Sequence, residues 1–310
     1  MKIEILMSTY NGRTYIQEQL DSLLSQSHDD FHITVRDDGS KDGTLPILEQ
    51  YRERFPEKIF VIADQRNLGY PDCFWELLAC APRADMYAFC DQDDVWDSDK
   101  LRCCVEKCAD IDPSTPVLYL HDYQICDAQL NVYEEHHIDT SLLSKDNIYK
   151  SIYYFFAPGF SMVLNESLRQ RMLRDPLAKK DIPHDRWTMW SGLIAGQMIH
   201  DDRMLVKYRR HEKTVTQTGK NNLIMLREWW RDDIMGDRFA GWSRIARYFA
   251  DCYRNEMEQI DENCYDRWRF IAGSNKGIAS YFKRLFFPRR LKPTLAGEIV
   301  LRICFAMNKK

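Results

Sequence analysis

No stretch of this sequence is apolar for the roughly 18–20 residues that a membrane-spanning helix requires. The longest uncharged stretch, residues 151–165, is interrupted by Pro158 and Gly159. The opening residues, Met-Lys-Ile-Glu-Ile-Leu-Met, are too short and too acidic for a secretory signal. We therefore expect a cytoplasmic protein. Its ten cysteines are expected to be free thiols, because disulfides are rare in a reducing cytosol. A zinc site is not expected either, because no pair of CxxC motifs offers a set of zinc ligands.

The familiar phosphate-binding and calcium-binding motifs are also missing. There is neither a GxxxxGK[ST] loop nor a GxGxxG sequence, and the acids near Asp38 and Asp91 lack the glycine and glutamate of an EF-hand loop. A nucleotide, if this chain binds one, must then be held by acidic residues and a metal ion.

Net charge is low overall but uneven along the chain. The whole sequence carries −4, which argues against a general attraction to nucleic acid. Residues 265–310 hold eleven Lys and Arg against two Asp and Glu, a net charge of +9, which leaves −13 for residues 1–264. Basic residues interleaved with aromatic ones predict a segment that lies at an anionic membrane surface. The alternative is a basic helix that packs on the acidic body of the same chain or on a second subunit.

Apolar runs alternate with helical patterns through the first ninety residues. This βαβ alternation predicts an α/β fold, a mostly parallel central sheet flanked by helices. The second half is less regular, and from about residue 222 the pattern becomes helical and predicts a C-terminal helical extension. The predicted strands are 2–8, 31–35, 59–63, 86–90, 117–125, 160–164 and 203–208, and the predicted helices include 16–24, 45–55, 74–80 and 166–173.

Polar clusters follow the first four predicted strands, at residues 9–13, 37–40, 67–69 and 91–94. In a parallel sheet these positions meet at one edge, where ligands bind. Asp91-Gln92-Asp93-Asp94 is the most acidic cluster, and carboxylates of this kind bind Mg²⁺ or Mn²⁺ together with substrate phosphates. The alternative is that Asp93 and Asp94 begin the next helix, which Asp97 or Ser98 caps.

Four segments in order resemble the family 2 inverting glycosyltransferases of the GT-A fold, over roughly residues 1–215. They are Ser8-Thr9-Tyr10-Asn11-Gly12, Arg36-Asp37-Asp38-Gly39-Ser40-Lys41-Asp42-Gly43-Thr44, Asn67-Leu68-Gly69 and Cys90-Asp91-Gln92-Asp93-Asp94-Val95-Trp96. The last segment is most similar to the rhamnosyltransferase-like branch, whose members build bacterial surface polysaccharide.

The resemblance implies which residues hold a nucleotide-sugar donor. Thr9, Tyr10 and Asn11 would surround the base and ribose. Asp38 would accept the ring N–H of the base, as suits a carboxylate that only accepts, although an Asx turn is the alternative for it. Asn67 and Gly69 would lie beside the nucleotide, or serve only as a loop. Asp91 and Asp93 match the DxD signature: Asp91 would reach the ribose or the metal, Gln92 beside it would contact the donor, and Asp93 would bind the metal on the diphosphate.

The resemblance also implies the groups for catalysis. Transfer with inversion needs one general base, which the family carries at a helix start in the second half. His184-Asp185-Arg186-Trp187 matches by position, so Asp185 is the expected base, with a helix N-cap as the alternative. His211, in Tyr208-Arg209-Arg210-His211, is similar to a family histidine that contacts metal or diphosphate; an ordinary surface histidine is the alternative.

Taken together, the sequence predicts a metal-dependent inverting glycosyltransferase with Mg²⁺ or Mn²⁺. The resemblance implies L-rhamnose from dTDP-rhamnose as the sugar and a lipid-linked glycan at the inner membrane leaflet as the acceptor. A UDP-hexose transferase and a non-catalytic nucleotide-sugar-binding module are the alternatives, and a homodimer is left open. The expected division is residues 1–112 for the donor, 113–220 for the acceptor and 221–310 for the helical extension.

Overall fold

The computed structural model describes residues 1–62, 64, 66–174, 182–211, 230–232, 236–273 and 278–307. Within it the chain forms two compact units. The first unit comprises Met1–Ile138, Ala157–Gly192 and Gly196–Lys213, and the second comprises Asp139–Phe156, Leu193–Ala195 and Thr214–Lys310. The functional boundaries expected at residues 112 and 220 stay predictions.

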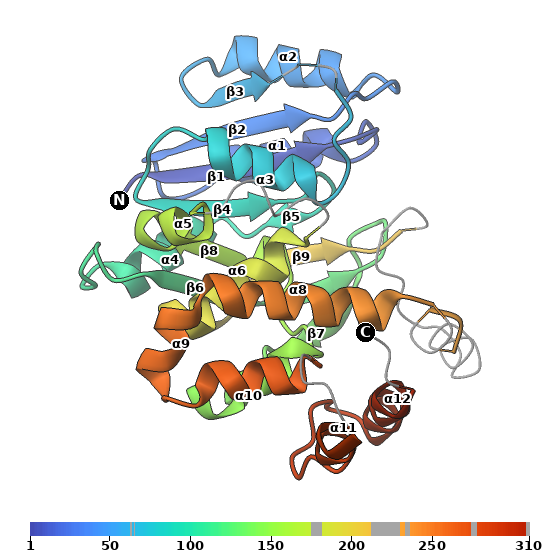
Figure 1. Ribbon diagram of the computed structural model, residues 1–310. Coiled ribbons are helices and arrows are strands. Elements are labelled where there is room, and N and C mark those ends of the chain that lie inside the picture. The colour runs from blue at the N-terminus through green and yellow to red at the C-terminus, as the bar shows by residue number, and fades with distance from the viewer. Residues whose placement is uncertain are drawn as a thin grey trace. The chain divides into compact units, whose positions relative to one another are not determined.

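The first unit is built on one sheet, which has nine strands among the described residues (Figure 1). The strand order is β3-β2-β1-β4-β8-β6-β9-β5, and β7 pairs with β6 beside this path. The strands are β1 (Ile3–Thr9), β2 (Phe31–Asp37), β3 (Ile59–Ile62), β4 (Met86–Cys90), β5 (Val95–Trp96), β6 (Val117–Cys126), β7 (Val132–His136), β8 (Met162–Asn165) and β9 (Gln197–Arg209).

The predicted α/β fold is confirmed, and the sheet is mixed. Strands β1, β2, β3 and β4 are mutually parallel, with Thr9 beside Asp37 and Met7 beside Cys90. Strand β8 then runs antiparallel to both β4 and β6, whereas β6 and β9 are parallel. Because β1, β2 and β4 end at matching levels, the polar segments that follow them emerge at the same edge of the sheet, as predicted.

Helices cover both faces of this sheet because its strands alternate their side chains between two cores. On one face Ile3, Ile5 and Met7 pack with Ile16, Leu20 and Leu23 of a helix, which recur at helical spacing. On the other face Phe89 meets Phe74 at a ring distance of 5.9 Å. The helices of this unit are α1 (Ile16–Leu24), α2 (Thr44–Arg54), α3 (Asp72–Cys80), α4 (Lys100–Cys108), α5 (Glu166–Met172) and α6 (His184–Ala195).

Several predicted boundaries differ from the structure. Strand β9 begins at Gln197 rather than 203, and β8 begins at Met162 because residues Gly159–Ser161 form a 3₁₀ turn. Strands β5 and β7 were not predicted: β5 has two residues, and β7 is exposed on nearly every residue and carries no alternating pattern. The three cysteines of α4 are buried thiols, and none of the ten cysteines, all of which lie among the described residues, is in a disulfide bond.

The second unit is helical, as predicted for the C-terminal region. Its helices pack around Tyr153, whose hydroxyl donates to the Ile271 carbonyl at 3.1 Å. No helix among the described residues is long and apolar enough to cross a membrane. The elements are the 3₁₀ turns Thr140–Leu143 and Lys145–Ile152 and the helices α8 (Arg238–Cys252), α9 (Arg254–Ile260), α10 (Cys264–Ile271), α11 (Ile278–Leu285) and α12 (Leu295–Ala306). The part of the helical pattern expected between residues 222 and 229 lies outside the described residues.

Candidate active site

The loops after β1 and β2 are held together by side-chain hydrogen bonds. The buried hydroxyl of Thr9 donates to Asp37 at 3.1 Å, and the amide oxygen of Asn11 accepts from the backbone N–H of Lys41 at 2.8 Å. Asn11 has a φ of +50°, in the left-handed region that asparagine tolerates. Tyr10, between them, is 49% exposed and leaves its ring open to a ligand. The predicted base-binding residues therefore form one rigid rim.

Gln92 joins this rim to the acidic turn after β4. Its amide oxygen accepts from the Tyr10 backbone N–H at 2.9 Å, and its amide nitrogen donates to the Tyr10 carbonyl at 3.1 Å. A Cβ atom at Gly12 would lie only 2.1 Å from the same amide oxygen, so the glycine makes room for this contact. Gln92 thus fixes the loop after β1 and the turn after β4 relative to one another.

Replacing Gln92 with alanine should weaken donor binding about tenfold, because two hydrogen bonds of about 0.5–1.5 kcal/mol each are lost. Titration calorimetry with a nucleoside diphosphate measures this change. Gln129→Ala, at an exposed glutamine in a turn, is the matched control and should leave affinity unchanged. Equal affinity of the Gln92 variant and the parent would show that the loops hold their places without the amide.

Asp38 lies at this rim, but its carboxylate already has protein partners. Its two oxygens accept from the backbone N–H groups of Leu68 and Gly69, at 2.8 and 2.7 Å. The buried Arg36 guanidinium lies 3.4 Å from the same carboxylate. The Asx-turn alternative for Asp38 is therefore wrong, since its oxygens bind a loop thirty residues away. Asn67 and Gly69 are brought beside Asp38, as their predicted role requires.

The four residues 91–94 form a turn between β4 and β5. The alternative that Asp93 and Asp94 begin a helix is wrong, because β5 intervenes and α4 starts at Lys100 after Asp99. Burial raises the pKa of Asp91 to about 7, and the negative charges of Asp93 and Asp185 add to the effect. Burial likewise raises the pKa of Asp94. The acids therefore lie close enough together to repel one another's charge.

Asp93 and His211 meet at this turn, although 118 residues separate them. The His211 Nε2 atom lies 2.8 Å from Asp93 Oδ2, and the imidazole ring packs against Tyr15 at a centroid distance of 4.8 Å. The structure thus brings together the two residues predicted to bind metal. The carboxylate oxygen of Asp93 suits Mn²⁺ or Mg²⁺, and the imidazole nitrogen of His211 would be the weaker ligand for either ion.

No group of three or more His, Cys, Asp or Glu side chains able to hold a metal ion occurs among the described residues. A cation at Asp93 and His211 would therefore need further oxygen ligands from phosphates and water. This is the usual situation for Mg²⁺ beside a nucleotide. The residues present fit such a cation, with the donor supplying the remaining ligands.

Two buried basic residues that were not predicted from the sequence place positive charge near residues 91–94. Arg209, 2% exposed, donates from its backbone to Asp94 at 3.0 Å and from Nε to the Asp93 carbonyl at 2.8 Å. Lys100 is fully buried, donates to the Phe160 carbonyl at 2.8 Å and lies 3.2 Å from the centre of the Trp96 ring. Burial lowers the pKa of Lys100 to about 7. No local pattern marks either residue as buried, so only the fold reveals them.

Asp185 lies in the first turn of α6. It is not the N-cap, which is Pro183, so the capping alternative is wrong. Its Oδ1 atom accepts from the Arg186 backbone N–H at 2.7 Å and from the Tyr70 hydroxyl at 3.4 Å. Burial raises the pKa of Asp185. Burial also raises the pKa of the Tyr70 hydroxyl, and the negative charges of Asp185 and Asp91 add to that shift. Asp185 is therefore near the acidic turn as well as near the loop after Asn67.

The neighbour of Asp185, His184, is 3% exposed and packs among aromatic rings, at 4.1 Å from Phe74 and 4.6 Å from Phe89. Burial lowers its pKa to about 3, so its imidazole is neutral at physiological pH. His184 thus anchors the start of α6 to the sheet. Trp187 and Trp190 are also buried, which makes them core residues and leaves them no exposed face for a sugar.

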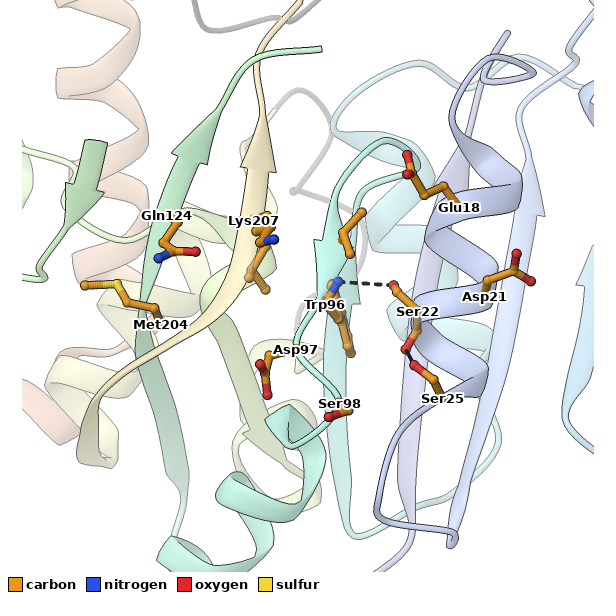
Figure 2. Close-up of a pocket in the computed structure, with 12 residues that line it drawn as sticks. Glu18, Asp21, Ser22, Ser25, Trp96, Asp97, Ser98, Gln124, Met204 and Lys207 are labelled. Carbon is orange, nitrogen blue, oxygen red and sulfur yellow. Dashed lines mark hydrogen bonds between the residues drawn. The ribbon is translucent and has the colours of Figure 1, made fainter. Parts of the chain in front are cut away.

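A cavity of about 490 Å³ lies beside β5 (Figure 2). Trp96 forms part of its wall, with Ser22 hydrogen-bonded to the Trp96 backbone at 3.1 Å. Side chains from α1, β5, β6 and β9 surround it, among them Glu18, Asp21, Gln124, Met204 and Lys207. None of the residues predicted to bind the donor or the metal lines this cavity.

Residues 4–171 match the model of glycosyl transferase family 2. The chain belongs to this family. Its family 2 relatives include the dTDP-rhamnosyl transferase RfbG of Shigella flexneri, 26% identical over 79% of this chain and 85% of RfbG. The putative teichuronic acid biosynthesis glycosyltransferase TuaG of Bacillus subtilis is 37% identical, but the match covers only 32% of this chain and 38% of TuaG.

Among solved structures, S. aureus TarS 1–349 in complex with UDP-GlcNAc superposes with a TM-score of 0.58 at 17% identity. The alignment covers 100% of this chain and 82% of that chain. This likeness is one of fold. The predicted GT-A fold is thereby confirmed.

Proposed function

We propose that this family 2 protein transfers a sugar, with inversion, from a nucleotide sugar to a glycan acceptor. The observation that carries the proposal is the convergence of Asp93, His211, Asp91 and Asp185 at one edge of the sheet. Asp93 and His211 are 118 residues apart in the sequence, and the fold brings their side chains to 2.8 Å from one another. Carboxylates that are partly desolvated and repel one another's charge, as Asp91, Asp93 and Asp185 do, are costly and are typical of functional sites.

Asp93 and His211 would hold Mg²⁺ or Mn²⁺. When bound, such an ion neutralises the charge that grows on a departing nucleoside diphosphate. The chain's own residues bind and orient the donor. Tyr10 and Asn11 present the rim for base and ribose, Asp38 and Gly69 lie beside them, and Gln92 keeps the rim next to Asp91.

Asp185 would act as the general base. Its Oδ1 atom accepts two hydrogen bonds from the protein, which leaves Oδ2 to accept the proton of an attacking hydroxyl group. A raised pKa brings this carboxylate closer to neutral pH, where proton transfer from a hydroxyl is most effective. Tyr70, whose own pKa is raised, stays protonated and keeps Asp185 oriented.

We propose L-rhamnose from dTDP-rhamnose as the transferred sugar, because RfbG, which matches most of the chain, is a dTDP-rhamnosyl transferase. The name of TuaG, a putative teichuronic acid biosynthesis glycosyltransferase, supports a role in bacterial polysaccharide synthesis. We propose a lipid-linked glycan at the inner membrane leaflet as the acceptor. We also propose that residues 1–112 bind the donor, 113–220 the acceptor, and 221–310 the membrane.

The donor is tested by thermal melting of the full chain with dTDP-, UDP- and GDP-sugars, with and without Mn²⁺. A donor present about 100-fold above its dissociation constant should raise the melting temperature by about 5 °C or more. We expect dTDP-rhamnose with Mn²⁺ to have the largest effect. A larger effect of a UDP-hexose would support the alternative donor. Binding without release of nucleoside diphosphate, when acceptor is supplied, would support a non-catalytic module.

A further inference from the structure

Helix α12 exposes an apolar face. Its exposed positions recur every three to four residues, and all of them are apolar. Leu295 is 67% exposed, Ile299 52% and Ile303 37%, and Met307, just past the helix, is 46% exposed. Surface helices of globular proteins normally show the opposite arrangement, with charged residues outward. The exposed residues are Leu295, Ala296, Ile299, Ile303, Ala306 and Met307.

The charged residues of α12 are turned toward the protein instead. Glu298, 7% exposed, accepts from the backbone N–H groups of Leu291 and Lys292, at 2.8 and 2.9 Å. Arg302 donates at 2.8 Å to Glu298 and at 2.9–3.0 Å to the carbonyls of residues 284, 285, 287 and 289. Both side chains hold the loop between α11 and α12, so neither is available to solvate the exposed face.

The loop that Arg302 holds is aromatic and basic. Phe286 is 74% exposed and Phe282, one turn earlier on α11, is 50% exposed. Lys283, Arg289 and Arg290 are exposed among them. The apolar face of α12 and a cluster of basic side chains therefore belong to one helical hairpin, fixed by the hydrogen bonds of a single arginine.

We propose that this hairpin inserts its apolar face into an anionic lipid bilayer surface. Large exposed apolar patches mark interaction sites, and an amphipathic element rich in Lys and Arg is suited to anionic lipid headgroups. Charge favours lipid over a second copy of the chain, because residues 265–310 carry +9 and two such segments repel. The proposal makes the membrane association suggested above specific to one face, and it does not depend on glycosyl transfer.

The test is flotation of the full chain with vesicles of phosphatidylcholine alone or with about 30% phosphatidylglycerol. We expect binding to the anionic vesicles that falls with added salt. Ile299→Asp together with Ile303→Asp should reduce binding by about tenfold or more, since two apolar side chains no longer insert. Phe60→Asp, at a side chain 63% exposed on β3, is the matched control and should bind like the parent.

A second variant tests the electrostatic contribution to vesicle binding separately from the insertion of apolar side chains. Arg289→Glu with Arg290→Glu should abolish the preference for anionic vesicles, and both positions are exposed, so folding should persist. Absence of vesicle binding by the parent, or unchanged binding by the Ile299/Ile303 variant, would overturn the proposal. The proposal would also be overturned if the parent protein were a dimer that the Ile299/Ile303 variant converts to a monomer, because the apolar face of α12 would then be a subunit interface. Donor-induced melting shifts are measured in parallel, so a failure of the proposed function is seen separately.

Discussion

Replacing Asp185 with asparagine is expected to lower the rate of sugar transfer about 10²–10⁴-fold, the usual contribution of a general base. Asparagine keeps the shape of the side chain and can still accept from the Arg186 backbone N–H. It cannot take up a proton from an acceptor hydroxyl group. Donor affinity should therefore stay near that of the parent, and the loss should fall on turnover. Single-turnover kinetics and titration of the nucleoside diphosphate measure the two quantities separately.

The same residue should determine how transfer depends on pH. Burial raises the pKa of Asp185 above its ordinary value of 3.8. The base must be ionised, so transfer should rise as pH increases through this raised pKa and should be lost as pH falls below it. The acidic limb of the rate profile is expected above pH 3.8 in the parent and absent from the residual activity of the asparagine variant.

Two further variants sharpen this experiment. Tyr70→Phe removes the 3.4 Å hydrogen bond to Asp185 but keeps the carboxylate, so the loss of rate should be much smaller than in Asp185→Asn. Asp202→Asn, at an exposed aspartate of β9, is the matched control. If Asp185→Asn transferred sugar at the parent rate, another group would have to be the base.

The second large effect is expected for Asp93→Ala, which should remove the part of donor affinity that depends on a divalent cation. In the proposed metal site Asp93 would supply one of two protein ligands, and losing even an outer partner of a ligand typically costs about 10–100-fold in metal affinity. Because His211 lies 2.8 Å from Asp93, His211→Ala should have a similar effect. The two losses should not add, since both variants disrupt one site.

Titration of a nucleoside diphosphate with Mn²⁺ and with EDTA measures the cation-dependent difference directly. Asp97→Asn is the matched control, because Asp97 is an exposed acid of the same segment whose side chain faces the Asp99 backbone. Its cation dependence should equal that of the parent. Undiminished Mn²⁺-dependent affinity in Asp93→Ala would contradict the assignment of the metal to this pair.

Secondary structure followed from the sequence wherever local pattern and tertiary environment agreed. Strand β4, a buried apolar run, matches its predicted bounds of 86–90. Strand β9 was predicted too short because its first half contains His200, Asp201 and Asp202, which hide the strand pattern. Asp201 is nevertheless buried, since Tyr119 and Arg203 bind its carboxylate at 2.9 Å or less. Partners distant in sequence thus allow charged residues inside a sheet.

Some features of the candidate site could be predicted from local sequence, and others could not. The acids at strand ends could be found from local sequence, because a strand that is buried to its last residue must deliver the next side chains to the sheet edge. The hydrogen bonds of Gln92 to Tyr10 and of Asp38 to Leu68 and Gly69 could not, since each joins loops 30 or more residues apart. Arg209 and Lys100 were missed for the related reason that burial of a cation leaves no local signature.

The sequence by itself determined the α/β alternation, the edge of the sheet where the acids gather and the basic character of the C-terminal segment. Each of these follows from side-chain period and charge along the chain. Tertiary structure alone decided that Asp93 pairs with His211, that Asp185 is oriented by Tyr70, and that α12 turns its charges inward. These depend on which distant groups meet, and on the burial that follows, because desolvation and hydrogen bonding act on neighbours in space.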